Sequence, residues 1–510
     1  MPIDFGQLGF AYTLDLCTAI EKYTARETAR NHSAFQYRGM DLRYAVERYL
    51  YIRCVNSETL FAFYAGLSGS AHAQSAQPMD FVVAKVAHEF IGASTQMIPF
   101  HPLPLQGWSM LRWLYGQLRE RCSPAQRPMP ATAEAHVPIL FHVVHQKFAS
   151  YLRPVVRHLT RNDYAYLVSE NANLASAMEA LGEPYLFGSR STATLRSVFL
   201  GSTLRGFHGL VEAADRVLSA IRRIRPRCVV VVEGNAPLDS ITAEVCRLLN
   251  VPTLCVQQGW SPVVHSGFRN MSFDDMFVWG EAIENLLQPF NPRQRFTVTG
   301  SHALHARGPD REGSNVGALV ISFFLQAPCA LLSARGYEDF IGLIIGCAAS
   351  HSAVRFIVRE HPSYPVPARL RAKLQMDNIR FSAASSEMLG EVIRASSLVV
   401  SVFSTVLLEA IALDTVPLIC SIGSLPHYEP DLARLGAAIE VSSLADAREV
   451  IDKVVRDAGY LAPYKDRLAV VSARYFRSVD AGRAISDRIK AVAGISGVEV
   501  SQLAHRLDQS

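Results

Sequence analysis

Two short polar strings in the sequence each follow an apolar run that is typical of a buried parallel strand: Arg-Glu-His-Pro at 359–362 and Ser-Val-Phe-Ser-Thr at 401–405. Ligands bind at the carboxyl ends of strands in open α/β sheets, because the loops leaving that edge form a crevice. The second string also precedes an apolar helix at 406–413, whose N-terminus and hydroxyls would attract a phosphate. We therefore predict a nucleotide-phosphate pocket formed by Arg359, His361, Pro362, Ser401, Ser404, Thr405 and Glu409.

Each string by itself has an ordinary structural explanation. Ser and Thr are common helix N-caps, and a His-Pro pair after a strand is more often a turn than a site. Both strings occur in one half of the chain, however, and a helix end followed by another buried strand comes next, at 414–419. That combination favours the pocket.

Glu233 is the best candidate for a catalytic group in the first half of the chain. It directly follows the run 229–232, which consists of four valines and is the clearest buried strand, and Gly234 then allows a sharp turn. A carboxylate at such a strand end could be a general base or a nucleophile. It could equally cap the helix near Leu238 or pair with an arginine.

Further polar residues follow neighbouring strands and should border the same cleft. Gln258 and Trp260 would suit sugar hydroxyls and the face of a sugar ring, although they also suit ordinary loop packing. His265, shortly after, is a second catalytic candidate. The strand ends before them add His145, Gln146 and Glu170 to the acceptor side, together with His142 and Asn171. No His and carboxylate spacing recurs, so we predict no metal site.

Composition limits the class of protein. A chain of 510 residues is too long to fold around one hydrophobic core, which suggests two or three domains. Half are hydrophobic and 19% are charged, which indicates a globular chain with a large interior. The net charge of +4 is too small to indicate a nucleic-acid binder. Nine cysteines without a CxxC pair, and no secretory leader, predict buried thiols in the cytoplasm, with peripheral membrane attachment left open.

Alternating strand and helix patterns predict an α/β fold with two doubly wound parallel sheets facing each other across a cleft. An α-rich extension should precede them, with helices within 40–63 and 108–121, and should pack on the first sheet domain rather than insert into lipid. We expect an extension at 1–130 that ends in a Pro-rich linker. A first Rossmann-like domain at 131–310 should carry the acceptor and the catalytic carboxylate, and a second at 311–495 should bind the donor. A tail at 496–510 should follow.

With these motifs in order, the chain resembles GT-B glycosyltransferases that use CMP-activated sugars. It is most similar to the bacterial sialyltransferases and to the transferases that add Kdo (3-deoxy-D-manno-oct-2-ulosonic acid) to capsule and lipopolysaccharide. The resemblance covers about 137–480 and rests on Glu233-Gly234, Gln258-Gly259, Trp279-Gly280-Glu281, Val298-Thr299-Gly300, His361-Pro362 and Ser404-Thr405.

The resemblance implies roles for three of the matched motifs. Glu233 would be the base or nucleophile, His361-Pro362 would contact the CMP phosphate, and Ser404 and Thr405 would bind that phosphate. Only one acidic residue precedes Gly234, where sialyltransferases commonly have two, so Kdo is the favoured donor sugar. The expected partners are a CMP-sugar and a glycan or lipid-linked glycan acceptor, with no cofactor and no metal.

Two rival classes remain open from the residues. One is another GT-B enzyme, such as a UDP-sugar transferase, an epimerase or a glycerophosphate transferase. The other is a non-catalytic subunit of a polysaccharide assembly complex.

Overall fold

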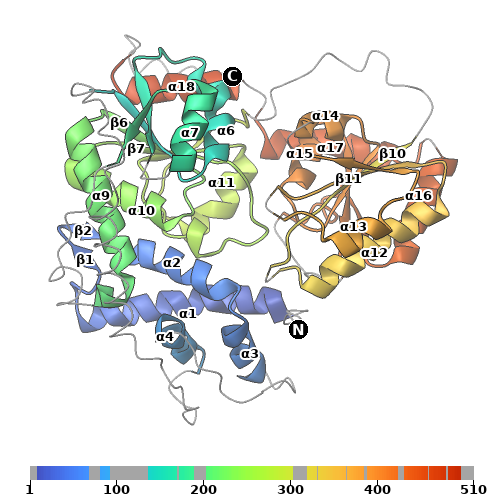
Figure 1. The fold of residues 1–510 in the computed structure, drawn as a ribbon, viewed down its shortest axis with the longest axis horizontal. Coiled ribbons are helices and arrows are strands. Elements are labelled where there is room, and N and C mark those ends of the chain that lie inside the picture. Colours follow the sequence, from blue (N-terminus) through green and yellow to red (C-terminus); the bar gives the residue numbers. More distant parts are fainter. Residues whose placement is uncertain are drawn as a thin grey trace.

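A computed structural model describes residues 8–67, 81–91, 136–168, 172–188, 203–302, 319–329, 331–362, 364–383, 387–422, 430–457, 459–477 and 480–495. Two parallel sheets, each covered by helices, form two α/β domains (Figure 1), and a helical extension lies against the first of them. The predicted helix at 108–121, the Pro-rich linker before 131, the domain boundary at 310 and the tail at 496–510 lie outside the described residues.

The first domain contains a seven-stranded parallel sheet of order β5-β4-β3-β6-β7-β8-β9. Strand β6, Cys228–Val232, lies at its centre and is completely buried because helices cover both faces. The other strands are β3 (Ile139–His142), β4 (Tyr164–Val168), β5 (Tyr185–Phe187), β7 (Thr253–Val256), β8 (Asp275–Val278) and β9 (Phe296–Val298). The helices are α6 (Gln146–Val156), α7 (Ala172–Leu181), α9 (His208–Ile224), α10 (Pro237–Leu249) and α11 (Glu281–Leu287), with 3-10 turns η1 (Thr203–Phe207), η2 (Ser266–Phe268) and η3 (Gln288–Phe290).

The second domain contains a six-stranded parallel sheet of order β12-β11-β10-β13-β14-β15. The strand order reverses at β10 and β13, so the carboxyl ends of these strands form the crevice of this sheet. The strands are β10 (Val320–Phe324), β11 (Arg355–Arg359), β12 (Ile379–Ser382), β13 (Leu398–Ser401), β14 (Val416–Cys420) and β15 (Ile439–Val441). The helices are α12 (Ala334–Ser350), α13 (Ala368–Lys373), α14 (Leu389–Arg394), α15 (Val406–Ala412), α16 (Leu444–Arg456) and α17 (Ala462–Tyr475).

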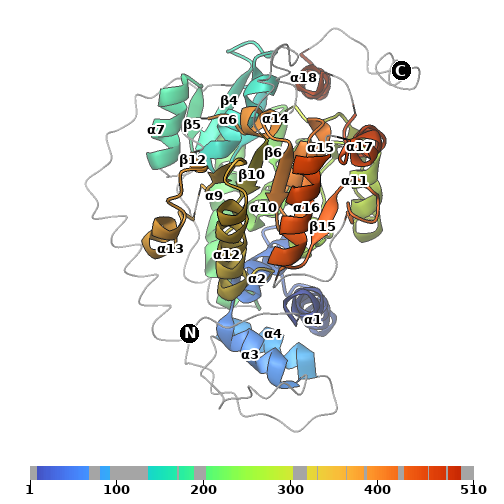
Figure 2. The same cartoon turned by 90° about the vertical axis from the view of Figure 1, so that its right-hand side faces the viewer.

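The described part of the extension packs on the first domain, as predicted. It consists of α1 (Leu8–Arg30), α2 (Arg43–Val55), α3 (Glu58–Leu67), α4 (Phe81–Ile91) and a small hairpin of β1 (Gln36–Tyr37) and β2 (Met40–Asp41). Apolar residues of these helices share one core with α9 and α10. Figure 2 shows α1, α3 and α4 below the two sheets.

The last helix corrects the predicted domain boundary. Helix α18 (Ala481–Val492) was expected to complete the second domain, but it crosses back and packs on the first (Figure 1). Its Ile485 and Ile489 belong to the core around β3, β4 and β6, and Arg488 pairs with buried Asp275 of β8 at 3.3 Å. The apolar face of α18 finds its partner surface on α6, which local sequence patterns do not reveal. Among the described residues, no helix is both long and apolar enough to cross a membrane.

Candidate active site

Glu233 lies at the carboxyl end of the central strand β6, in an unusual backbone conformation. Its φ is +72°, and Gly234 follows with +76°. A Cβ at Gly234 would come within 2.8 Å of the Cys255 sulfur and 2.9 Å of the Phe273 ring, so only glycine fits there. A positive φ at a non-glycine residue is costly and occurs mainly at functional sites. The strained turn directs the Glu233 side chain away from the strand.

The surroundings of Glu233 suit a general base. The side chain is half-buried, and burial raises the pKa of its carboxyl, while the charge of Lys147 and a hydrogen bond from Asn235 oppose that rise. A raised pKa brings a carboxylate closer to the working range of a proton acceptor. Asp239, rather than Glu233, makes the capping hydrogen bond of α10, since its carboxylate accepts the Ala236 N–H at 3.0 Å.

Gly259 connects Glu233 with the second domain. A Cβ built on Gly259 would lie 4.0 Å from Glu233 Oε1 and 3.6 Å from Thr405 Oγ1. The carboxylate of one domain and the hydroxyl of the other therefore approach the same point. This agrees with the expectation that the two sets of strand ends face each other across one cleft.

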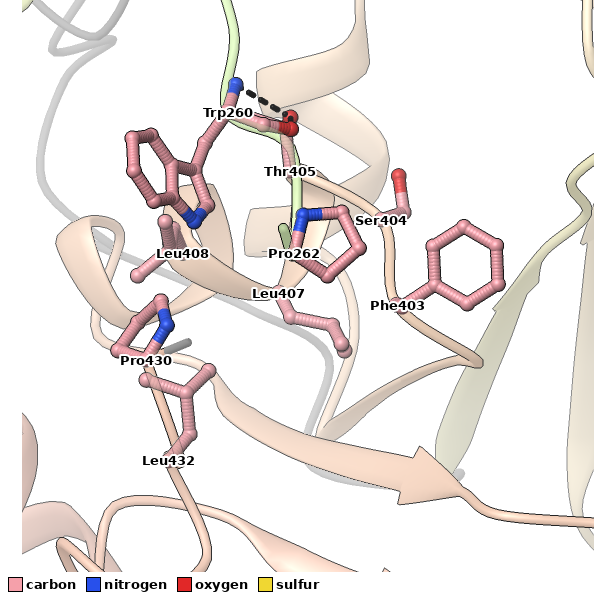
Figure 3. A pocket seen from close by; sticks show the side chains of 9 residues that line it. All are labelled: Trp260, Pro262, Phe403, Ser404, Thr405, Leu407, Leu408, Pro430 and Leu432. Carbon is pink, nitrogen blue, oxygen red and sulfur yellow. Dashed lines mark hydrogen bonds between the residues drawn. The ribbon is translucent and has the colours of Figure 1, made fainter. Parts of the chain in front are cut away.

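Thr405 bridges the two domains through the Trp260 peptide groups (Figure 3). The Trp260 N–H donates to Thr405 Oγ1 at 3.1 Å, and the Thr405 hydroxyl donates to the Trp260 carbonyl at 3.0 Å. The Thr405 side chain thus does not cap α15, because its hydroxyl turns to the other domain. Ser404 Oγ instead accepts the Val406 N–H at 3.3 Å.

A small pocket opens beside this bridge, between the loop after β7 and the start of α15. Its free volume of about 20 Å³ has room for about one water molecule. The pocket is lined by Trp260, Pro262, Phe403, Ser404, Thr405, Leu407, Leu408, Pro430 and Leu432.

His361 and Pro362 follow β11 at the edge of the same cleft. His361 is half-buried and Pro362 is exposed. Burial lowers the pKa of the His361 imidazole, and the nearby Lys147 ammonium lowers it further. The imidazole is therefore neutral near pH 7, where it can hydrogen-bond to a phosphate but adds no charge.

The side chains of Arg359 and Ser401, predicted to contact the donor, form hydrogen bonds within the second domain. The buried Arg359 guanidinium donates to Ser382 Oγ at 2.8 Å and to the Glu387 carbonyl at 3.0 Å. The fully buried Ser401 hydroxyl donates to the Phe324 carbonyl at 2.8 Å. Both side chains point into the second domain. Side chains alternate between the two faces of a strand, so a polar residue at the end of a strand can be turned inward.

No protein-family model and no curated protein matches the sequence. Solved structures match the fold. A UDP-N-acetylglucosamine 2-epimerase is 15% identical with a TM-score of 0.50, over 71% of this chain and 97% of that one. The UDP-GlcNAc 2-epimerase of Neisseria meningitidis is 13% identical with a TM-score of 0.48, over 70% and 98%. The calicheamicin glycosyltransferase CalG4 is 14% identical with a TM-score of 0.46, over 71% and 99%.

The chain has the GT-B fold. The two parallel-sheet domains and the structural match confirm this prediction. The matches span about 70% of the chain.

His265 does not lie where a catalytic group of the GT-B cleft would be useful. Its ring stacks on Tyr51 of α2, with centroids 4.5 Å apart, and its Nδ1 accepts the Gly267 N–H at 3.0 Å. Burial, reinforced by the charges of Arg48 and Arg269, lowers the pKa of the imidazole to about 3. A neutral ring held between two elements is a packing group, so the predicted catalytic role of His265 is not supported.

The remaining predictions for the first domain have mixed outcomes. His145 and Gln146 are exposed at the start of α6, and His145 Nδ1 accepts the Lys147 N–H at 3.0 Å, which caps that helix. Gln258 is half-buried in the loop after β7.

His142 is buried, and its Nδ1 lies 2.8 Å from Thr242 Oγ1, so its predicted place beside the cleft is wrong. Glu170 and Asn171 lie outside the described residues.

Two residues of α6 were missed by the sequence analysis. Lys147 is exposed, and its charge lowers the pKa of both Glu233 and His361. The Tyr151 hydroxyl donates to the Gln257 carbonyl at 2.7 Å, and Tyr151 also lies near Glu409 of α15. The signal for Lys147 was its place in the first helical turn after a strand, where a basic residue faces the crevice.

Glu409 is half-buried on α15, and burial raises the pKa of its carboxyl to about 7. Its predicted contact with the donor stays a prediction. Within the part of the chain that the structure describes, no group of His, Cys, Asp and Glu side chains could hold a metal ion.

Proposed function

We propose that this protein is a glycosyltransferase that moves a sugar from a nucleotide-sugar donor to an acceptor hydroxyl, with Glu233 as the base. The observation that supports it most is the meeting of Glu233 and Thr405 beside Gly259. A carboxylate on one domain and phosphate-binding groups on the other are what transfer across a GT-B cleft requires.

The proposed inverting step uses few groups. Glu233 takes the proton of the acceptor hydroxyl as its oxygen attacks the anomeric carbon, and the bond from that carbon to the phosphate oxygen breaks. The negative charge that grows on the leaving phosphate is stabilised by His361, Ser404 and the Lys147 ammonium. In a retaining reaction, Glu233 would first attack the anomeric carbon and displace the nucleotide phosphate, which gives a glycosyl-enzyme. The acceptor hydroxyl would then attack that carbon, lose its proton and release the Glu233 carboxylate.

The finer proposal is that the donor is CMP-Kdo and that the acceptor is a growing lipopolysaccharide or capsule glycan. The motif order supports it, since Glu233-Gly234, His361-Pro362 and Ser404-Thr405 resemble the transferases that use this donor. Lys147 adds support, because a cation beside Glu233 could bind the carboxylate of an ulosonic acid.

A nucleotide screen by thermal shift tests the donor, since a ligand that binds only the native state raises its apparent stability. We expect CMP and CTP to raise the melting temperature more than UMP and UDP do. Selective stabilisation by UDP would contradict the CMP proposal.

The reaction class is tested separately with CMP-Kdo, CMP-sialic acid and UDP-GlcNAc, followed by NMR of the products. Release of CMP with transfer of Kdo to a glycan acceptor is expected. Conversion of UDP-GlcNAc to its 2-epimer without an acceptor would indicate an epimerase. No turnover and no nucleotide binding would leave a non-catalytic assembly subunit.

A further inference from the structure

The loop that follows β7 joins the helical extension to the GT-B cleft. Its first part carries Gly259, which lies beside Glu233 and Thr405, and Trp260, which is hydrogen-bonded to Thr405. Its last part, around η2, lies against α1 and α2 of the extension. One continuous segment, 257–269, therefore has one end at the site and the other end on a region that the proposed reaction does not use.

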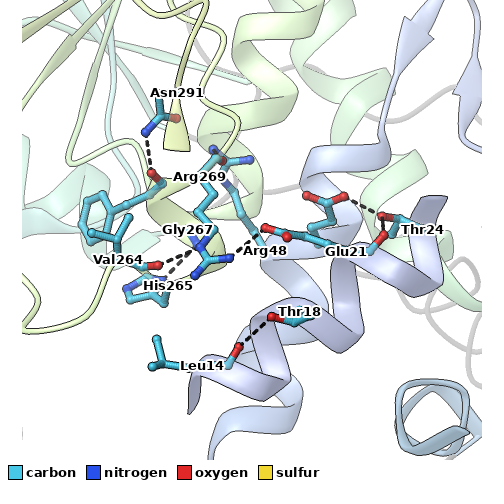
Figure 4. A network of polar contacts seen from close by, with 12 residues as sticks. Leu14, Thr18, Glu21, Thr24, Arg48, Val264, His265, Gly267, Arg269 and Asn291 are labelled. Atoms are coloured by element: carbon cyan, nitrogen blue, oxygen red, sulfur yellow. Dashed lines mark hydrogen bonds and ion pairs between the residues drawn. The ribbon is translucent and has the colours of Figure 1, made fainter. Parts of the chain in front are cut away.

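Polar contacts attach the far end of this loop to the extension (Figure 4). Arg269 pairs with Glu21 of α1 at 3.1 Å, and its Nε donates to the Val264 carbonyl at 2.8 Å. Arg48 of α2 is 1% exposed and donates to the Arg269 carbonyl at 3.3 Å. A buried guanidinium requires partners, so its bonds to the loop backbone hold the loop and α2 together.

A row of ring contacts then runs from the extension to the cleft. Tyr51 stacks on His265 with only 7° between the ring planes, and His265 contacts Phe268 at 4.9 Å between centroids. Phe268 stacks on Trp260 at 6.3 Å, and Trp260 is bound to Thr405. Aromatic side chains have few rotamers, so each ring restricts the position of the next.

We propose that Tyr51 is a positioning residue for the transfer site: through His265 and Phe268 it holds Trp260 against Thr405, beside Glu233. The inference rests on the proposed function for its catalytic consequence only. It assigns the extension a role in orienting the cleft wall and explains why His265 is a packed, neutral ring. The hydroxyl of Tyr51 is not needed for this role, whereas its ring is.

The test compares full-length Tyr51→Leu, Tyr51→Phe and a matched control, Tyr49→Leu. Tyr49 lies on the same helix and is also half-buried, but its ring packs edge to face on Phe207, away from the loop. The first readout is amide hydrogen exchange over 258–269. We expect about threefold to tenfold faster exchange in Tyr51→Leu, and wild-type exchange in Tyr51→Phe and Tyr49→Leu.

The second readout is transfer kinetics. Tyr51→Leu should lower kcat about tenfold with the donor KM nearly unchanged, because the wall moves while the donor domain does not. Unchanged exchange in Tyr51→Leu, or equal effects in Tyr49→Leu, would overturn the positioning role. If exchange changes as expected but wild-type protein transfers no sugar, the proposed reaction fails and the positioning role stands.

Discussion

The two strand ends that face each other across the cleft are built in opposite ways. After β6, the backbone is strained at Glu233 and the carboxylate is left half-buried at the cleft. After β13, the hydroxyls of Ser401, Ser404 and Thr405 all take part in hydrogen bonds within the protein. The first turn presents a reactive group, whereas the second organises its own domain and the junction with the other.

A polar residue at a strand end is therefore not by itself a ligand contact. What separates the two turns is which partners the side chains already have. Substitutions on the two sides should therefore differ in kind. On the Glu233 side the reacting group is lost, whereas on the other side transfer slows or stability falls because the domain junction or the packing of the second domain changes.

Glu233→Gln should have the largest effect. It removes the charge but keeps the shape, so we expect transfer to fall by about 10²-fold to 10⁴-fold while nucleotide binding is retained. Steady-state transfer and thermal shift with CMP measure the two properties. The control is Glu58→Gln, an exposed carboxylate at the start of α3. Near-normal transfer by Glu233→Gln would eliminate the residue as base and as nucleophile.

The same variant separates the two mechanisms. Intact-protein mass spectrometry of the wild type with donor alone should show no adduct if the reaction inverts. An adduct that peptide mapping places on Glu233, absent in Glu233→Gln, would establish retention.

Thr405→Val should have the next largest effect. It removes both hydrogen bonds to the Trp260 peptide while preserving the side-chain shape, so we expect about tenfold to hundredfold slower transfer. Thr405→Ser should restore most of the rate because it keeps the hydroxyl. If Val and Ser behave alike, the bridge has no part in the reaction.

Lys147→Met should change the pH dependence. Lys147 lowers the pKa of Glu233, so its removal raises that pKa and favours the protonated carboxyl, which cannot act as a base. The acid limb of kcat/KM should move to higher pH, with about a tenfold rise in donor KM. Lys373→Met, at an exposed position of α13, is the control. An unshifted acid limb would contradict the placement of the Lys147 charge.

Ser401→Ala should have the smallest effect on the reaction. It leaves the buried Phe324 carbonyl without its partner, which costs about 1–3 kcal/mol of the free energy of unfolding. We expect a lower melting temperature and a nearly normal kcat for the folded enzyme. A large loss of kcat at unchanged stability would restore the predicted donor contact of Ser401.

Much of the architecture could be predicted from local patterns. Runs such as 228–232, with one cysteine and four valines, are recognisable as buried strands because their continuous hydrophobicity requires cover on both faces. Strand β12 and helices α12 to α14 were not predicted, since their apolar residues are interspersed with polar ones and acquire meaning only in the folded sheet.

Local patterns in the sequence are enough to predict that two parallel sheets form. They also predict that polar residues such as Glu233, His361 and Thr405 gather at strand ends, because strand periodicity and burial are local properties of the chain. Tertiary structure alone decided what those groups touch. It turned the Thr405 hydroxyl to Trp260, stacked His265 on the extension, brought the charge of Lys147 within reach of Glu233 and His361, and returned α18 to the first domain. Such contacts join residues far apart in the chain, so no local pattern encodes them.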